Sequence, residues 1–370
     1  MKIVIFGLSI TSSWGNGHAT TYRSLARALH ARGHQILFFE HDVEWYASNR
    51  DMPEPPFCDV RIYENWADIV AEARRELLDC DVAMVGSYFP DGIAAIDEVL
   101  ESRAPAKIFY DIDTPITVAK LRAGDAEYVS PQQVPGFDLY FSFTGGPMLC
   151  ELESRFGATR AVPLYCSFDT ERYRHCPVAR FQCDMSYMGT YAPDRQAKIA
   201  EYLCEPARRL PQKRFILAGP QYPPEIAWPA NVRRIIHLEP KYHAAFYSSS
   251  RLTLNVTRRE MVVAGYSPSV RLFEAAACGA TIVSDCWPGL ESFFVPGEEI
   301  LLPDCSTDVV RYLSEMDETE IERIGRSAQE RVLAEHTAQR RAEQFEGYVV
   351  GALHKSREEL LNPIAIREHA

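Results

Sequence analysis

Short apolar runs alternate with amphipathic stretches along most of the chain. In the first half, helical patterns at residues 20–32 and 91–101 lie among strand-length apolar runs at residues 2–6, 35–39, 81–86, 107–110 and 137–143. Continuous apolar strands separated by helices are typical of a parallel sheet that is covered on both faces. The pattern therefore predicts an α/β fold.

The same alternation starts again near residue 184. Helical patterns at residues 193–209 and 269–278 lie among strand runs at residues 185–189, 213–218, 232–236, 252–256 and 281–284, whereas residues 163–182 are irregular. We therefore predict two Rossmann-like domains, at residues 1–170 and 171–335, whose strand ends face a common cleft. A charged helical tail is expected at residues 336–370.

Composition and charge narrow the class of protein. With 370 residues, of which 46% are hydrophobic and 24% charged, the chain is an ordinary globular protein of about two domains. The net charge of -12 argues against a general nucleic-acid binder, because phosphate neutralisation needs a basic surface. No apolar run is long enough for a transmembrane helix. Ten scattered cysteines without a Cys-x-x-Cys pair indicate buried thiols in a reducing cytoplasm.

The loop after the first strand is long and rich in glycine. Gly15 and Gly17, with Glu40 to hold a ribose, suggest a dinucleotide fingerprint, but the glycines lie far beyond the strand and Thr20 replaces the third one. A second interpretation is that the glycines let the backbone approach another ligand closely. His18 would then start a helix as a general base or a phosphate ligand, unless it only caps its own loop.

Two carboxylates, Asp111 and Asp113, follow the strand at residues 107–110. This spacing resembles the metal clamp of one class of sugar transferases and, with Thr114, the motif of aspartyl-phosphate phosphatases. Side chains at alternate positions of a strand point to opposite faces, which disfavours a shared ligand. An acid in an acceptor pocket or a structural anchor are the other interpretations. Asp113 is the expected pocket residue, because it lies farther beyond the strand.

Two loops of the second half could bind a diphosphate. In the first, Gly189 and Thr190 precede a helix that carries Arg195 in its first turn, although Asp194 could simply cap that helix. In the second, within residues 265–279, Ser267 and Ser269 could cap a helix that starts near Val270. Arg271 and Glu274 would share a face of that helix, either to grip a diphosphate and a ribose or to form a surface salt bridge.

The segment at residues 274–283, Glu-Ala-Ala-Ala-Cys-Gly-Ala-Thr-Ile-Val, resembles the donor-binding motif of group 1 GT-B glycosyltransferases. The chain as a whole, over about residues 1–350, is most similar to the CgeB-like (spore maturation protein CgeB) branch. That similarity lies in residues 113–115, 143–147, 187–191 and 267–271.

The resemblance implies two Rossmann-like domains, an acceptor on the first, a nucleoside-diphosphate sugar on the second, and a C-terminal helix that crosses back to the first domain. Catalytic roles are expected for His18 and Asp113. Donor contacts are expected for Gly17, Gly189, Thr190, Arg195, Leu238, Ser267, Ser269, Val270, Arg271 and Glu274. Tyr266 stands where many retaining members have a glutamate, so stereochemistry stays open.

We therefore expect a cytoplasmic, metal-independent glycosyltransferase that uses a UDP-, GDP- or dTDP-linked sugar and no further cofactor. A nucleotide-sugar epimerase or hydrolase on the same fold is an alternative. A non-catalytic protein that binds a nucleotide or glycan is another, and a metal-dependent Asp-x-Asp transferase is a third. The expected partners are the donor and an acceptor substrate, without general nucleic-acid binding, and a homodimer is compatible with the sequence.

Overall fold

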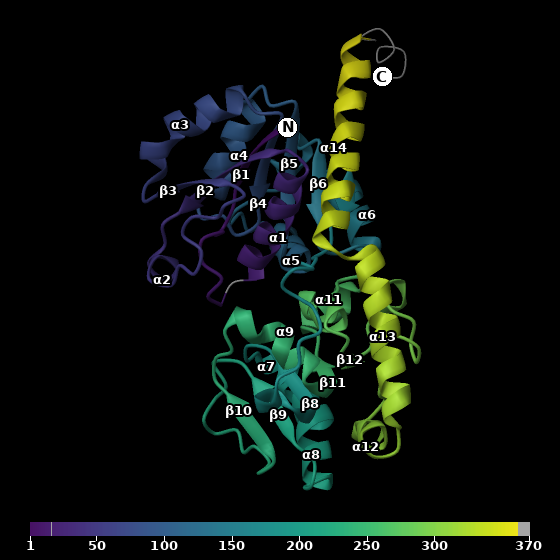
Figure 1. Cartoon of the computed structure of the whole chain (residues 1–370). Helices are drawn as coiled ribbons and strands as arrows, with labels where there is room; N and C mark the ends of the chain where they lie inside the picture. Colours follow the sequence, from purple (N-terminus) through teal and green to yellow (C-terminus); the bar gives the residue numbers. More distant parts are fainter. Residues whose placement is uncertain (16, 362–370) are drawn as a thin grey trace. The chain divides into compact units, whose positions relative to one another are not determined.

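The computed structural model describes residues 1–15 and 17–361, which form two compact units (Figure 1). Unit 1 consists of Met1–Tyr165 and of the segment that starts at Gln339, and unit 2 consists of Cys166–Ala338. The sequence analysis placed the corresponding limits at residues 170 and 335. None of the described helices is long and apolar enough to cross a membrane.

Unit 1 is built on a sheet of seven parallel strands in the order β3-β2-β1-β4-β5-β6-β7. The strands are β1 (Lys2–Phe6), β2 (Gln35–His41), β3 (Asp59–Tyr63), β4 (Val82–Gly86), β5 (Ala106–Asp111), β6 (Leu139–Ser142) and β7 (Ala161–Pro163). Nearly all residues of β1, β2, β4 and β5 are buried, as in strands that are covered on both faces.

The helices of unit 1 include one from the C-terminal end of the chain. They are α1 (Gly17–Ala31), α2 (Glu44–Ala47), α3 (Trp66–Leu78), α4 (Gly92–Glu101), α5 (Thr114–Ala123), α6 (Pro147–Phe156) and α14 (Ala338–Leu361). The rings of Phe345 and Tyr348 on α14 lie 5.5 and 5.8 Å from the Phe141 ring of β6. The C-terminal helix therefore packs on the unit that the N-terminal part of the chain forms.

Unit 2 has a sheet of five parallel strands in the order β10-β9-β8-β11-β12. The strands are β8 (Cys183–Met188), β9 (Phe215–Ala218), β10 (Val232–Ile235), β11 (Ser250–Asn255) and β12 (Thr281–Ser284). The helices are α7 (Pro193–Ile199), α8 (Glu205–Arg209), α9 (His243–Ser248), α10 (Arg259–Ala264), α11 (Val270–Ala277), α12 (Ser306–Ser314) and α13 (Glu318–Glu335).

In both sheets the order in which strands are added reverses beside the first strand of the unit. β1 lies between β2 and β4, and β8 lies between β9 and β11. In open α/β sheets, ligands bind outside the carboxyl ends of the strands at such a switch point. The loops after β1, β4 and β5 in unit 1, and those after β8 and β11 in unit 2, are therefore the places to look for a site.

The strands predicted from apolar runs are all present, and their ends agree to within about two residues. The edge strands β3 and β7 were not predicted, because β3 has two exposed residues and no continuous apolar run and β7 has only three residues. The helix predicted at residues 193–209 is present with those bounds, in three consecutive helical segments. A π-helical turn, Ala200–Cys204, separates α7 from α8, where Pro206 has no N–H to continue the regular pattern.

Candidate functional site

Glu40, at the end of β2, holds the loop that follows β1. Its buried carboxylate accepts hydrogen bonds from the Ser9 hydroxyl (3.0 Å), the Ile10 amide (2.7 Å), and the amide (3.0 Å) and hydroxyl (2.5 Å) of Thr11. Four donors satisfy both oxygens of a buried carboxylate. The hypothesis that Glu40 binds the ribose of a dinucleotide is therefore wrong, since its acceptor capacity is used within the loop.

His18 and Asp113, which the sequence analysis selected separately, lie in contact within unit 1. His18 is the second residue of α1, and Asp113 is the N-cap residue of α5. His18 Nε2 is 2.6 Å from Asp113 Oδ2. A carboxylate only accepts, so Nε2 carries the proton of the neutral ring and Nδ1 carries the lone pair. Such a pair can take a proton from a hydroxyl, because the carboxylate stabilises the resulting imidazolium.

Packing of α1 against β4 fixes where His18 stands. The Tyr22 ring is buried one turn along α1, and its centroid lies 6.4 Å from that of His18. Gly86 ends β4 directly beneath this ring, and a Cβ there would lie 1.7 Å from the Tyr22 hydroxyl. Only glycine at position 86 therefore lets α1 approach the sheet this closely.

Asp111 does not share a ligand with Asp113. Its fully buried carboxylate accepts hydrogen bonds from the Tyr140 hydroxyl (2.6 Å) and the Thr117 hydroxyl (2.7 Å). Burial raises the pKa of Asp111 to about 7, although both hydrogen bonds oppose the increase. The Asp-x-Asp metal clamp therefore does not fit these two residues, because one carboxylate faces the core and the other faces His18. Within the described part of the chain, no cluster of three His, Cys, Asp or Glu side chains could hold a metal ion.

In unit 2, three of the predicted donor residues converge at the end of β8. A Cβ on Gly189 would lie 2.7 Å from the Tyr187 hydroxyl and 3.1 Å from Arg271 Nη2, so glycine at this position lets both side chains approach the backbone closely. Arg195 is buried and donates from Nη2 to the Thr190 carbonyl, while its Nε has no partner among the described residues. Burial lowers the pKa of Arg195, and the positive charge of Arg271 adds to this effect.

Asn255, at the end of β11, orients the second guanidinium. Its Oδ1 accepts hydrogen bonds from Arg271 Nη1 (2.9 Å) and from the Ser269 hydroxyl (3.0 Å). Ser269 occupies the N-cap position of α11, but its hydroxyl does not cap the helix as the sequence analysis expected. Within the described structure, neither Arg195 nor Arg271 forms an ion pair with a carboxylate.

Glu274 lies on α11, the helix that also carries Arg271, and its side chain is buried. The predicted alternative, a surface salt bridge between Arg271 and Glu274, is wrong, because the carboxyl is buried and no ion pair joins them in the described chain. Burial raises the pKa of Glu274 to about 7, opposed by a hydrogen bond from Tyr173 and by the charge of Arg271.

A series of side-chain contacts connects Glu274 to the loop after β10. The Tyr173 hydroxyl lies 3.5 Å from His243 Nδ1, and His243 Nε2 donates to the Leu238 carbonyl at 3.2 Å. Desolvation lowers the pKa of His243 to about 4, so its ring is neutral at pH 7. Sequence reasoning missed Tyr173, His243 and Asn255. Only Asn255 carried a local signal, since it is a polar residue at the carboxyl end of an apolar strand.

The remaining predicted residues lie in the same two loop systems. Gly17 is the exposed first residue of α1, where an added Cβ would meet nothing within 4 Å. Thr190 is exposed beside Gly189, Ser267 is buried before α11, and Val270 is the half-buried first residue of that helix.

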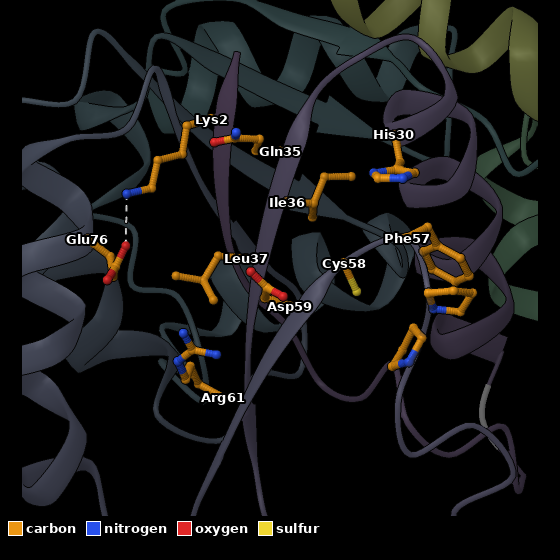
Figure 2. A pocket seen from close by; sticks show the side chains of 12 residues that line it. Lys2, His30, Gln35, Ile36, Leu37, Phe57, Cys58, Asp59, Arg61 and Glu76 are labelled. Carbon is orange, nitrogen blue, oxygen red and sulfur yellow. Dashed lines mark ion pairs between the residues drawn. The ribbon is translucent and has the colours of Figure 1, made fainter.

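A cavity of about 620 Å³ lies at the amino-terminal ends of the unit 1 strands (Figure 2). Lys2, Gln35 and Asp59, the first residues of β1, β2 and β3, line it. Lys2 Nζ is 2.8 Å from Glu76 Oε2, so these two charges satisfy each other. Because the amino ends of parallel strands lie opposite their carboxyl ends, this cavity is separate from His18 and Asp113.

The family described as "Glycosyl transferase-like" matches residues 195–347, less than half of the chain. No curated protein matches.

Solved structures resemble the chain over almost its whole length. Sucrose-phosphate synthase from Thermosynechococcus elongatus is 14% identical with a TM-score of 0.67, over 96% of this chain and 100% of that one. Anabaena Alr3699/HepE in complex with UDP-glucose is 13% identical with a TM-score of 0.71, over 95% and 100%. AviGT4, a glycosyltransferase involved in avilamycin A biosynthesis, is 16% identical with a TM-score of 0.61, over 96% and 98%. Two parallel-sheet Rossmann-like units and this full-length likeness to glycosyltransferases give the chain the GT-B fold.

Proposed function

We propose that this protein is a metal-independent glycosyltransferase of the CgeB-like branch that takes its sugar from a nucleoside diphosphate. The observation that carries the proposal is the pair Arg195 and Arg271, which converge on Gly189 without a carboxylate partner in the described chain. Positive charge that is held partly buried and unpaired is unfavourable unless a ligand compensates it. A diphosphate supplies that charge, and guanidinium groups match its geometry.

Neighbouring residues would bind the two other parts of the same ligand, its ribose and its base. In the proposed complex, the carboxylate of Glu274 accepts hydrogen bonds from the ribose hydroxyls, and the backbone around Leu238 contacts the base. The two guanidinium groups stabilise the diphosphate as it leaves, which is the work that a divalent metal does in other transferases. Glycosyl transfer involves no change of oxidation state, so the proposed reaction needs no redox cofactor.

His18 and Asp113 would act on the acceptor. In the proposed step, the His18 imidazole takes the proton of the acceptor hydroxyl, the hydroxyl oxygen bonds to the anomeric carbon, and the bond from that carbon to the diphosphate breaks. Asp113 stabilises the imidazolium through the 2.6 Å contact with Nε2. The reaction requires the acceptor and the donor to meet during turnover. A base of this kind supports direct displacement with inversion.

Calorimetric titration with UDP, GDP, dTDP and uridine tests the donor site. The Arg271→Ala variant should bind its preferred diphosphate about tenfold to a hundredfold more weakly, because a hydrogen bond to a charged group contributes about 1.5–3 kcal/mol. Arg233→Ala, which removes an exposed arginine of β10, is the matched control and should bind normally. Equal affinity of Arg271→Ala and the wild type for every diphosphate would contradict the site, and donor breakdown without acceptor would favour a hydrolase or epimerase.

A further inference from the structure

Two exposed tryptophans lie at the carboxyl edge of the unit 1 sheet. Trp14, in the loop after β1, is 49% exposed, and Trp45, in α2 after β2, is 56% exposed. A tryptophan brings a large apolar face, and leaving it in water forgoes the free energy that burial would supply. Exposed aromatic side chains next to a candidate site are therefore a feature that a ligand would explain.

The loop that carries Trp14 is held in place by its neighbours. The buried guanidinium of Arg23 donates to the Ile10 carbonyl (2.7 Å) and, through two nitrogens, to Asp51 (2.8 and 2.9 Å). Asp51 in turn accepts from the amide and the hydroxyl of Ser13, both at 2.8 Å. The residue before Trp14 is thus fixed to the segment after α2, so the indole projects from an anchored loop.

A chain of hydrogen bonds also links the main chains of the two tryptophans. The Trp14 amide donates to the Ser12 hydroxyl (3.4 Å), which donates to the Asn49 carbonyl (2.8 Å). Asn49 Nδ2 then donates to the Trp45 carbonyl at 2.8 Å. Trp14 and Trp45, called the tryptophan pair below, are therefore parts of one ordered surface and not two unrelated exposed residues.

This surface lies within reach of the His18–Asp113 pair. Trp14 precedes His18 by four residues, which limits the distance between their Cα atoms to about 14 Å. A short oligosaccharide spans that distance. An oligosaccharide with a hydroxyl at His18 is therefore long enough to reach Trp14.

We propose that the tryptophan pair is an acceptor subsite that binds a sugar unit beyond the one that reacts, so that the acceptor is a glycan chain. This inference rests on the proposed function. The two faces of a pyranose ring carry C–H groups that pack on an indole, while its hydroxyls stay at the edge in contact with water. Half-exposed tryptophans among polar residues such as Ser12, Ser13 and Asp51 suit that amphipathic ring, whereas a planar aromatic acceptor would favour an enclosed apolar pocket.

Indole ¹⁵N–¹H NMR spectra of the full chain test the subsite directly. The five tryptophans give separate indole signals, which the Trp14→Phe and Trp45→Phe variants assign. Maltotetraose, cellotetraose and chitotetraose are the probes, with glucose and p-nitrophenol for comparison. We expect a tetrasaccharide to shift the Trp14 and Trp45 signals, to shift them more than glucose does, and to leave the buried Trp287 unchanged. If none of the tetrasaccharides shifts either signal at millimolar concentration, or if only p-nitrophenol does, the proposal is wrong.

A double variant, Trp14→Ala with Trp45→Ala, supplies the second measurement. It should weaken tetrasaccharide binding about tenfold or more and raise the acceptor KM, with little change in kcat. Leu78→Ala is the matched control, because Leu78 is an exposed apolar residue at the other end of the same unit. UDP, GDP and dTDP titrations run in parallel. If the wild type binds none of these nucleotides, the proposed function is wrong. If the wild type binds a nucleotide and the double variant binds the tetrasaccharide as well as the wild type does, only the subsite is wrong.

Discussion

Glutamine at position 274 should have two opposite effects, a more stable free protein and a weaker nucleotide site. The Glu274 side chain is buried, and burial raises its pKa from 4.5 to about 7. When the folded pKa lies above the unfolded value, the protonated form is favoured by folding. The contribution of such a carboxyl to stability is therefore complete below pH 4.5 and is lost as the pH rises through 7.

The magnitude follows from the size of the shift. A change of 2.5 pKa units (7 minus 4.5) corresponds to about 3 kcal/mol of lost stability at high pH. By the linkage relation, about 1 kcal/mol of this stability has been lost at pH 5 and nearly all of it at pH 8. The two pH values therefore differ by about 2 kcal/mol. Glutamine keeps the shape of the side chain without its charge. Glu274→Gln should therefore melt roughly 4–8 °C higher relative to the wild type at pH 8 than at pH 5.

Scanning calorimetry of nucleotide-free protein at pH 5 and pH 8 measures this difference, with Glu322→Gln on the exposed face of α13 as the control. The same variant should bind its preferred nucleoside diphosphate about tenfold to a hundredfold more weakly, since the ribose loses a charged acceptor. An equal melting-temperature difference at both pH values would refute the electrostatic reasoning. A stabilised variant with unchanged nucleotide affinity would refute the role of Glu274 at the ribose.

Three further predictions follow from unit 1. His18→Ala should lower kcat about a hundredfold to ten-thousandfold and Asp113→Asn about tenfold or more, with unchanged nucleotide affinity in calorimetry, and a fully active His18→Ala variant would remove the base. Gly86→Ala should cost about 1–3 kcal/mol in urea unfolding, because the added methyl group meets the Tyr22 hydroxyl, and adding Tyr22→Phe should restore part of it; absence of rescue would contradict the clash. Glu346→Gln should lower the melting temperature at pH 7, because hydrogen bonds from Arg32 and His34 lower the pKa of Glu346 from 4.5 to about 2, and the difference should fade between pH 4.5 and 2.

Local patterns determined the layout of the elements and part of the site. Apolar runs placed β1, β5 and β8 because a strand buried on both faces needs a continuous run of apolar side chains. The helix α11 followed from its composition and spacing, and with it the shared face of Arg271 and Glu274. Edge strand β3 escaped prediction because one side of an edge strand faces water and leaves no continuous run.

Contacts between distant residues were decided by strand order. His18 and Asp113 are 95 residues apart and meet only because their strands share a sheet with β4 between them. The sequence named both residues but did not pair them. In the same way, it offered Ser269 as a helix cap, whereas the end of β11 brings Asn255 close enough to take that hydroxyl and to hold Arg271.

The division has a simple physical origin. Periodicity, capping and turn chemistry depend on residues a few positions apart. The sequence by itself therefore determined two α/β units, and it identified two loops that could bind a diphosphate in an otherwise acidic chain. Burial and partners depend on which elements become neighbours. Only the tertiary structure therefore decided that Glu40 and Asp111 are internal anchors, that Glu274 is buried on the helix of an arginine without a carboxylate partner in the described chain, and that Trp14 stands on an anchored loop.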